Sequence, residues 1–263
     1  MTSYPTIRPW DTPRPGDIHR LCLAADIEQY SRFDTPDQWA AQARLAQAMR
    51  AAAERSGLDH GKWSTQPQGD LEFAVLPPGT PEHLVLGEFV THLAAELGGY
   101  NATRRPAGRM RLRLAIDTGV AAMAALGFSG PAPIAVARYL NAPEVKQALA
   151  AAESASLVVV VSDRLYQDVV RSRSHGLDSE QYRRIHVQQK EFAGYGWVRL
   201  PGVDPQDEQE PGLTAPEGGP RHPARAAERA QPNFVQHGVQ GAAIQGVIHG
   251  SVFHGPVTGG SGR

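Results

Sequence analysis

The order of the strand and helix patterns constrains the fold of this chain more than any other feature of its sequence. The patterns lie, in order, at residues 19–27 (strand), 35–57 (helix), 62–68 and 71–77 (strands), 80–100 (helix) and 109–119 (strand). Gly69-Asp70 separates the middle two strands, as in a hairpin. The resulting order, β-α-β-β-α-β, predicts a single sheet in which strands distant in the chain become neighbours.

This order is typical of a ferredoxin-like (split βαβ) unit, so we expect an α+β fold. A largely antiparallel sheet is expected to carry its helices on one face. In the first helix we expect Thr35 to act as the N-cap, with Pro36 at the first helical position. The apolar stripe of this helix is expected to comprise Trp39, Ala43, Ala46 and Met49.

Further elements follow the first six. We expect a helix at about 133–152, a very apolar strand at 156–162, a short helix at 163–173, and strands at 182–189 and 194–202 with Gly194 to Gly196 between them. The strand at 109–119 alternates charged and apolar residues, which predicts that one of its faces is exposed.

The composition changes abruptly near residue 201. Residues 202–232 are rich in Pro, Gly, Glu and Arg and nearly lack large apolar side chains, so they cannot bury enough surface to offset the entropy of ordering. We therefore divide the chain into a disordered lead-in (1–17), a domain (18–201), a disordered linker (202–232), a glycine-punctuated β motif (233–257) and a disordered end (258–263).

Bulk properties exclude several classes of protein. The net charge of −1 gives no general attraction to nucleic acid or anionic lipid. No apolar run approaches the roughly 20 residues that cross a bilayer, so we expect no membrane partner. The single cysteine, Cys22, suits a reducing compartment, and we expect a cytoplasmic protein. Because Cys22 lies within an apolar strand, we expect it to be buried.

Two aspartates end neighbouring strands of the expected sheet. Asp26 ends the first strand and Asp70 lies in the turn before the third, and these strands are adjacent in a split βαβ sheet. Their carboxylates, with the carbonyl of Ile27, are hard oxygen ligands that suit Mg²⁺ or Mn²⁺. The alternative is that each aspartate only caps its strand or turn, a common role for this residue.

Five segments, in order, resemble those of one known family. They are LAADIEQYSRF (23–33), QGDLEFAVLP (68–77), LRLAIDTGV (112–120), GPAPIAVARYLNAP (130–143) and VVVVSDRLYQDVV (158–170). These segments are similar to the motifs of class III adenylate/guanylate (nucleotidyl) cyclase domains, and the resemblance covers about residues 18–201. The composition rich in Ala and Arg resembles cyclase-like domains of actinobacteria.

The resemblance implies a site shared between two protomers of a homodimer. Asp26 and Asp70 match the metal-binding aspartates, and Arg138 matches the arginine that stabilises the transition state. Other positions depart from the family pattern. Gln66 replaces the base-reading lysine, Gly127 replaces its Asp or Cys partner, and Ile134 replaces the asparagine four residues before the arginine.

These departures suggest a degenerate cyclase domain that binds metal and nucleotide in a signalling role, a pseudoenzyme. The alternative is an active, divergent cyclase that forms a cyclic nucleotide from a nucleoside triphosphate with Mg²⁺ or Mn²⁺. A third hypothesis, RNA binding, requires exposed aromatic residues on the central strands. Those strands offer only Phe73, expected in the core, and the arginines of 104–113 are expected to form a solvated face. The sequence does not favour a nucleic acid partner.

The segment 233–257 carries no Asp, Glu, Lys or Arg and combines β-branched residues, Gln and recurrent Gly. Such a composition is typical of stacked cross-β assemblies. The residues expected to stack are Val235, Gln236, Ile244, Gln245, Ile248, Val252 and Phe253. The segment resembles the C-terminal amyloid signalling motifs of bacterial immunity-type proteins, which implies a partner protein with a similar motif. Addition to the main sheet, or disorder, is the alternative.

Overall fold

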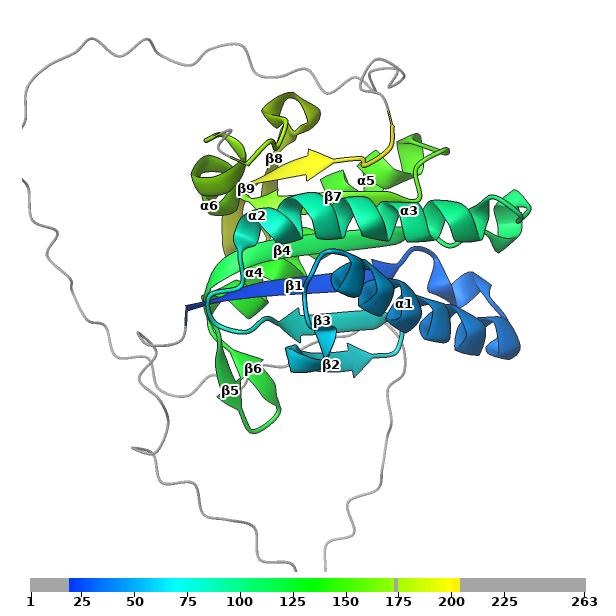
Figure 1. Cartoon of the computed structure of the whole chain (residues 1–263), viewed down its shortest axis with the longest axis horizontal. Coiled ribbons are helices and arrows are strands. Elements are labelled where there is room, and N and C mark those ends of the chain that lie inside the picture. The colour runs from blue at the N-terminus through cyan, green and yellow to red at the C-terminus, as the bar shows by residue number, and fades with distance from the viewer. Residues whose placement is uncertain (1–18, 173–174, 204–263) are drawn as a thin grey trace, which may run out of the picture. The chain divides into compact units, whose positions relative to one another are not determined.

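One seven-stranded sheet organises the part of the chain that the computed structural model describes, residues 19–172 and 175–203 (Figure 1). The strands are β1 (His19–Ile27), β2 (Ser64–Gln68), β3 (Leu71–Val75), β4 (Leu112–Val120), β5 (Ala122–Ala124), β6 (Gly127–Ser129), β7 (Leu157–Ser162), β8 (Arg183–Gln189) and β9 (Phe192–Arg199). The order in the large sheet is β2-β3-β1-β4-β7-β9-β8, and β5 pairs with β6. Only β4 and β7 are parallel neighbours. The predicted α+β fold with a largely antiparallel sheet is confirmed.

Helices cover both faces of this sheet. They are α1 (Thr35–Arg55), α2 (Glu82–Leu84), α3 (Val90–Asn101), α4 (Pro131–Leu140), α5 (Pro143–Ala151) and α6 (Asp163–Leu165). π-helical turns at Val85–Phe89 and Tyr166–Val170 follow α2 and α6. Turns of 3-10 helix lie at Tyr30–Arg32, His60–Lys62, Pro106–Gly108 and Ser179–Gln181.

Alternate residues of β1 divide between two cores. Leu23 packs with the residues of α1 and α3, which lie on the near side of the sheet in Figure 1, and Cys22 packs with those of α4 and α5. The expectation of helices on one face therefore holds for α1 and α3, the helices of the split βαβ unit. It does not hold for α4 and α5, because the strands carry apolar residues on both faces. Cys22 is buried, as predicted.

The first helix differs from the prediction at its cap and in its buried face. Asp34, rather than Thr35, is the N-cap, and its carboxylate accepts a hydrogen bond of 2.9 Å from the backbone N–H of Asp37. A charged oxygen also interacts favourably with the helix dipole, which favours Asp over Thr here. The buried residues of α1 are Ala41, Leu45, Ala48, Met49, Ala52 and Ala53. Of the predicted stripe only Met49 is buried, and Trp39 is 75% exposed.

The central strand β4 is buried on both faces, so the prediction of a half-exposed strand was wrong. It lies between β1 and β7, and helices cover it from both sides. Of its charged residues, Arg113 is paired with Asp26, as described below. The charged residue in the alternating pattern of this strand therefore faces a polar partner inside the protein rather than solvent.

Two other predicted boundaries change for identifiable reasons. The helix expected at 133–152 is broken into α4 and α5, because Pro143 has no backbone N–H to continue the first helix. Gly194 and Gly196 lie within β9 rather than in the turn before it. A Cβ on Gly196 would lie 3.0 Å from Cε1 of Tyr139, so these glycines allow the ring to pack on the strand.

The chain divides into two units, Met1–Leu213 and Thr214–Arg263, and all the described residues belong to the first. The predicted lead-in 1–17, most of the linker 202–232, the motif 233–257 and the end 258–263 lie outside the described residues. In the described residues no helix is long and apolar enough to span a membrane.

Candidate functional site

The two predicted metal-binding aspartates lie at the same end of neighbouring strands. Asp26 is the penultimate residue of β1 and is paired with Leu71 of β3. Asp70 precedes Leu71 in the β2–β3 turn, where Gly69 has a φ of 64° that favours glycine. The backbone N–H of Ile27 donates a hydrogen bond of 3.1 Å to the carbonyl of Asp70. The fold therefore brings Asp26, Ile27 and Asp70 together, as the split βαβ order required.

Arg113, which the sequence analysis did not select, is the closest partner of Asp26. Asp26 of β1 stands opposite Arg113 of β4 in the antiparallel register, and a guanidinium nitrogen, Nη2, contacts Oδ2 of Asp26 in an ion pair. Their side chains are 12% and 13% exposed. The expected topology places β1 beside β4, but the register that sets Asp26 opposite Arg113 is given only by the structure.

Burial and charge together set the protonation of this cluster. Burial raises the pKa of Asp26, the positive charge of Arg113 lowers it and the negative charge of Asp70 raises it, and the net effect is a pKa of about 6. Lys146 of α5 is also close enough to lower the pKa of Asp26. Burial and the positive charge of Arg113 lower the pKa of Lys146. Two carboxylates and two cationic side chains thus share this end of the sheet.

The donor set suits a hard divalent cation. Two carboxylates that repel each other gain most from a cation placed between them, and carboxylate oxygens are preferred by Mg²⁺ and Mn²⁺. Among the described residues no group of three or more His, Cys, Asp or Glu side chains converges at one point. A metal held by Asp26 and Asp70 would therefore complete its coordination with backbone, water or ligand oxygens, as Mg²⁺ commonly does.

Gln66 and Gly127 are brought into direct contact. Gln66 lies in the middle of β2, and Gly127 begins β6. A Cβ built on Gly127 would lie 2.4 Å from Oε1 of Gln66, so the amide occupies the space beside the glycine. The two positions that resemble base-reading residues are therefore adjacent, and they present a neutral amide and no second side chain.

Ile134 and Arg138 lie one turn apart on α4. Ile134 is 52% exposed, and Nε of Arg138 is buried without a hydrogen-bond partner among the described residues. In that part of the chain no hydrogen bond or ion pair links Arg138 to Asp26 or Asp70. The predicted site residues thus lie on three parts of the described fold: the aspartates at the end of β1 and in the β2–β3 turn, Gln66 and Gly127 on β2 and β6, and Ile134 and Arg138 on α4.

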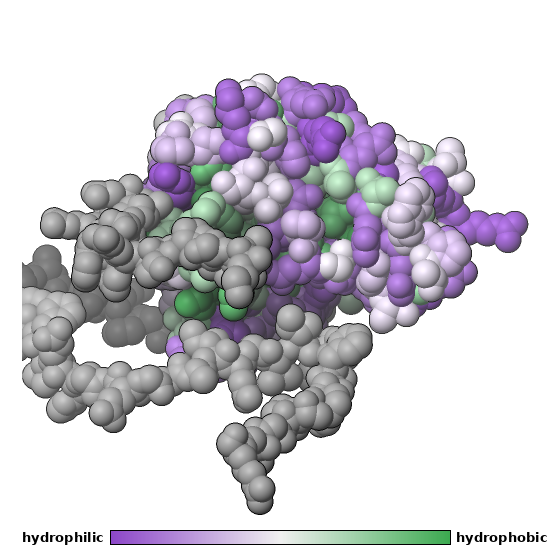
Figure 2. Space-filling model, turned by 90° about the horizontal axis from the view of Figure 1, so that it is seen from below, coloured by the Kyte–Doolittle hydropathy of each residue, from purple (hydrophilic) through white to green (hydrophobic). Residues whose placement is uncertain are grey.

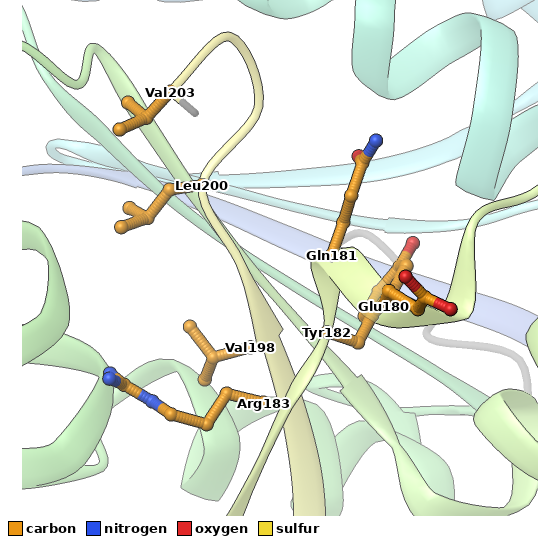
Figure 3. Close-up of a pocket in the computed structure, with 7 residues that line it drawn as sticks. All are labelled: Glu180, Gln181, Tyr182, Arg183, Val198, Leu200 and Val203. Carbon is orange, nitrogen blue, oxygen red and sulfur yellow. The ribbon is translucent and has the colours of Figure 1, made fainter. Parts of the chain in front are cut away.

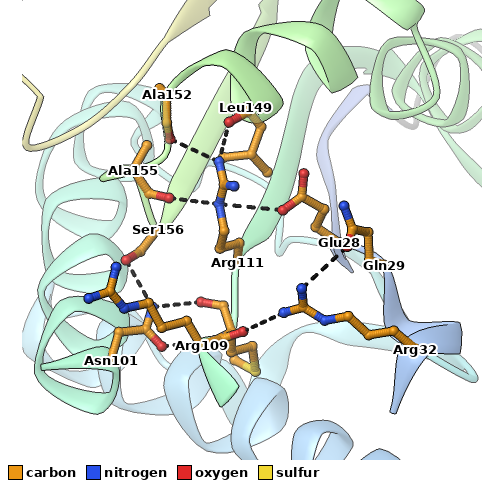
Figure 4. Close-up of polar contacts among 11 residues, drawn as sticks. Glu28, Gln29, Arg32, Asn101, Arg109, Arg111, Leu149, Ala152, Ala155 and Ser156 are labelled. Carbon is orange, nitrogen blue, oxygen red and sulfur yellow. Dashed lines mark hydrogen bonds and ion pairs between the residues drawn. The ribbon is translucent and has the colours of Figure 1, made fainter. Parts of the chain in front are cut away.

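The neighbouring arginines have structural roles (Figure 4). Arg111 donates hydrogen bonds to the carbonyls of Leu149, Ala152 and Ala155, at and beyond the end of α5, and forms an ion pair of 3.4 Å with Glu28. A cation at this position adds hydrogen bonds to carbonyls at the end of a helix and interacts favourably with the negative end of the helix dipole. The expectation that Arg111 and Arg113 form a solvated face was therefore wrong.

The feature that RNA binding would require is also missing from the central strands described here. Phe73 is buried, and its ring centroid lies 5.8 Å from that of Phe128. It is a core residue, as predicted, and offers no stacking surface for a base.

Two hollows elsewhere contain none of the predicted site residues. The hollow in Figure 3 has a volume of about 200 Å³ and is lined by Glu180, Gln181, Tyr182, Arg183, Val198, Leu200 and Val203. A groove of about 460 Å³ lies between β1, β3 and the β5–β6 hairpin, with Arg20 and Lys62 among the residues that line it.

Large apolar side chains are exposed at only a few described positions, namely Trp39, Met123, Leu126, Ile134 and Tyr195. On the face seen in Figure 2, apolar surface forms patches within a polar surface. The predicted assembly residues of 233–257, from Val235 to Phe253, lie outside the described residues.

Comparison with solved structures identifies the fold of the described residues, whereas comparison of the sequence finds no match. No protein-family model matches the sequence, and no curated protein matches it significantly. Among solved structures, an adenylate/guanylate cyclase/hydrolase from Silicibacter pomeroyi is similar over 70% of this chain and 96% of that chain, with 17% identity and a TM-score of 0.51. The guanylyl cyclase Cya2 is similar over 72% of this chain and 95% of that chain, with 10% identity and a TM-score of 0.49. The likeness to the Silicibacter pomeroyi structure shows that the described residues have the fold of an adenylate/guanylate cyclase domain.

Proposed function

We propose that this cyclase-like domain binds a divalent metal, Mg²⁺ or Mn²⁺, and a nucleotide, and has lost efficient catalysis. The placement of Asp26 beside Asp70, with Arg113 and Lys146 close by, carries the metal and nucleotide parts of this proposal. Carboxylates suit the metal, and cationic side chains next to them suit phosphate oxygens. Bound metal would supply charge neutralisation for the phosphates, while Asp26 and Asp70 orient it.

The proposal of degeneracy depends on Gln66, Gly127 and Ile134. The first two offer one neutral amide, that of Gln66 packed beside Gly127, in place of the two side chains expected to read the base. Ile134 places an apolar, exposed side chain one turn from Arg138, where an amide would stabilise developing charge. Arg138 alone of that group retains the predicted chemistry.

We further propose that two copies pair through this domain. Among the described residues no hydrogen bond or ion pair joins Arg138 to either aspartate, and we propose that a second copy supplies the arginine that completes the site. Met123 and Leu126 of the β5–β6 hairpin are exposed and apolar, a composition suited to an interface.

In the proposed signalling role, the domain senses a nucleotide and the segment 233–257 provides the output. Its charge-free composition supports homotypic β assembly with a partner effector that carries a similar motif, as in bacterial, and especially actinobacterial, immunity-type proteins. The single, buried Cys22 is compatible with a cytoplasmic setting.

An active divergent cyclase is the second candidate, and the retention of Asp26, Asp70 and Arg138 favours it. Incubation of the purified full chain with ATP, GTP, CTP or UTP and Mn²⁺ separates the two. For the pseudoenzyme we expect nucleotide binding by calorimetry that Asp26→Ala abolishes, with no cyclic product. The matched control is Asp59→Ala, which removes an exposed aspartate paired with Lys62. Cyclic product that disappears in Asp26→Ala but not in Asp59→Ala would establish the enzyme instead.

The proposed assembly is tested with a synthetic peptide of residues 233–257. We expect concentration-dependent fibres that bind thioflavin, and no fibres from a peptide with Ile244→Lys and Ile248→Lys, because stacked like charges repel. A parent peptide that stays monomeric at high concentration contradicts the proposed output.

A further inference from the structure

Among the described residues, the guanidinium of Arg113 has one polar contact, with the carboxylate of Asp26. Its Nη2 contacts Oδ2 of Asp26, while its Nε is buried and has no hydrogen-bond partner among the described residues. Most buried arginines use several of their five donors, as Arg111 does with three carbonyls and Glu28. The guanidinium of Arg113 is therefore held mainly by the charge of a single carboxylate.

That carboxylate is one of the two proposed metal ligands. A guanidinium and a divalent cation that approach the same carboxylate repel each other in a poorly solvated site. Lys146 of α5 adds a second positive charge near the pair. Two positively charged side chains, Arg113 and Lys146, therefore already lie near Asp26 in the absence of metal.

We propose that Arg113 is a tethered cation that competes with the divalent metal for Asp26. This inference rests on the proposed metal-binding function and adds a regulation of that site. Metal reaches Asp26 and Asp70 together only when the guanidinium has moved away from Oδ2. Because a buried guanidinium without a partner is costly, metal binding is weak unless an anion takes up the freed Arg113.

The competition predicts a gain of metal affinity on removal of a charged side chain. Mn²⁺ binding to the full chain without nucleotide is measured from the electron paramagnetic resonance signal of free Mn²⁺. We expect Arg113→Gln to bind Mn²⁺ about tenfold more tightly than the unaltered protein. In the unaltered protein metal binding must break the charge-assisted hydrogen bond between Arg113 and Asp26, and in the variant it need not. Arg113→Lys keeps the charge and is expected to stay within about threefold of the unaltered protein.

The outcomes distinguish this inference from the proposed function. If Arg113 only positions Asp26, Arg113→Gln binds Mn²⁺ more weakly, and the competition is wrong. Equal affinity in both proteins, lost in Asp26→Asn, also overturns the competition but leaves the metal site in place. Absence of Mn²⁺ binding from every variant, with or without nucleoside triphosphate, overturns both.

A second measurement needs no substitution and covers the case in which Arg113→Gln does not fold. In the unaltered protein, restricted rotation of the Arg113 guanidinium is observed by ¹⁵N nuclear magnetic resonance of arginine side chains. We expect the restriction to disappear when Mg²⁺ saturates the site, because the contact with Asp26 is broken. A restriction that persists with Mg²⁺ bound shows that metal and Arg113 share Asp26, and the proposal then fails.

Discussion

The side-chain amide of Gln66 fills the space beside Gly127, where a Cβ would lie 2.4 Å from Oε1. Gly127 has a φ of 123°, a conformation that side-chain-bearing residues rarely adopt. The glycine is therefore required by the backbone of the β5–β6 hairpin as well as by its neighbour. A residue with a base-reading side chain at 127 would need a different hairpin.

The cost of a side chain at this position should come from the backbone. We expect Gly127→Ala to lower the free energy of unfolding by about 1–3 kcal/mol, the range for a residue held at a sparsely populated φ. Gln66 is half-buried on the edge strand β2, and the end of its side chain is flexible, so it can move away at little cost. Urea denaturation of a double-mutant cycle with Gln66→Ala should then show a coupling below about 0.5 kcal/mol. A large rescue by Gln66→Ala would mean that the contact, not the φ, sets the cost.

The element order and the meeting of Asp26 with Asp70 were predictable because both depend on patterns that are local or follow directly from topology. The role of Arg113 was not predicted, because it depends on the register between β1 and β4, which no local pattern reveals. The alternation of charged and apolar residues in β4 also led to a wrong prediction of exposure. The helices α4 and α5 cover the face of the sheet that a split βαβ unit alone would leave open.

The buried face of α1 was mispredicted for a different reason. Alanine is abundant all around this helix, so two faces fit a three- and four-residue spacing equally well. The prediction chose the face that contains Trp39, because a large aromatic residue was assumed to be buried. Leu45 and Met49, one turn apart, mark the face that packs on the sheet.

Substitution of Trp39 tests this orientation of α1. Because Trp39 is 75% exposed, we expect Trp39→Ala to change the free energy of unfolding by no more than about 0.5 kcal/mol. Leu45 is buried, and Leu45→Ala should cost about 2–5 kcal/mol. Guanidinium denaturation followed by circular dichroism measures both. The reverse ranking would place Trp39 in the core.

The N-cap of α1 can be tested with two neighbouring residues. Asp34 accepts the 2.9 Å hydrogen bond from the N–H of Asp37, so Asp34→Ala should lose about 1 kcal/mol of stability. Thr35 makes no such contact and is the matched control, for which we expect a change within about 0.5 kcal/mol in Thr35→Ala. Thermal unfolding at pH 7 distinguishes them. A larger loss in Thr35→Ala would restore the cap first expected from the sequence.

Cys22 should be chemically silent in the folded protein. Burial, together with the negative charge of Asp117 and against the opposing charge of Arg20, raises the pKa of its thiol to about 12. The thiolate is the reactive form, so at pH 8 the folded chain presents neither the ionised thiol nor access to it. We expect Ellman's reagent to detect one thiol in guanidinium and no fast reaction in native buffer.

The same shift predicts how stability depends on pH. The folded pKa lies above the ordinary thiol value of 9.0, so above pH 9 the unfolded chain loses a proton that the folded chain keeps. The contribution of Cys22 to stability is therefore complete below pH 9 and falls as the pH rises from 9 to about 12. Cys22→Ala removes this dependence, and its unfolding free energy between pH 8 and pH 10 should decline less steeply than that of the unaltered protein. Parallel declines, or a native thiol that reacts at pH 8, would place Cys22 outside the core.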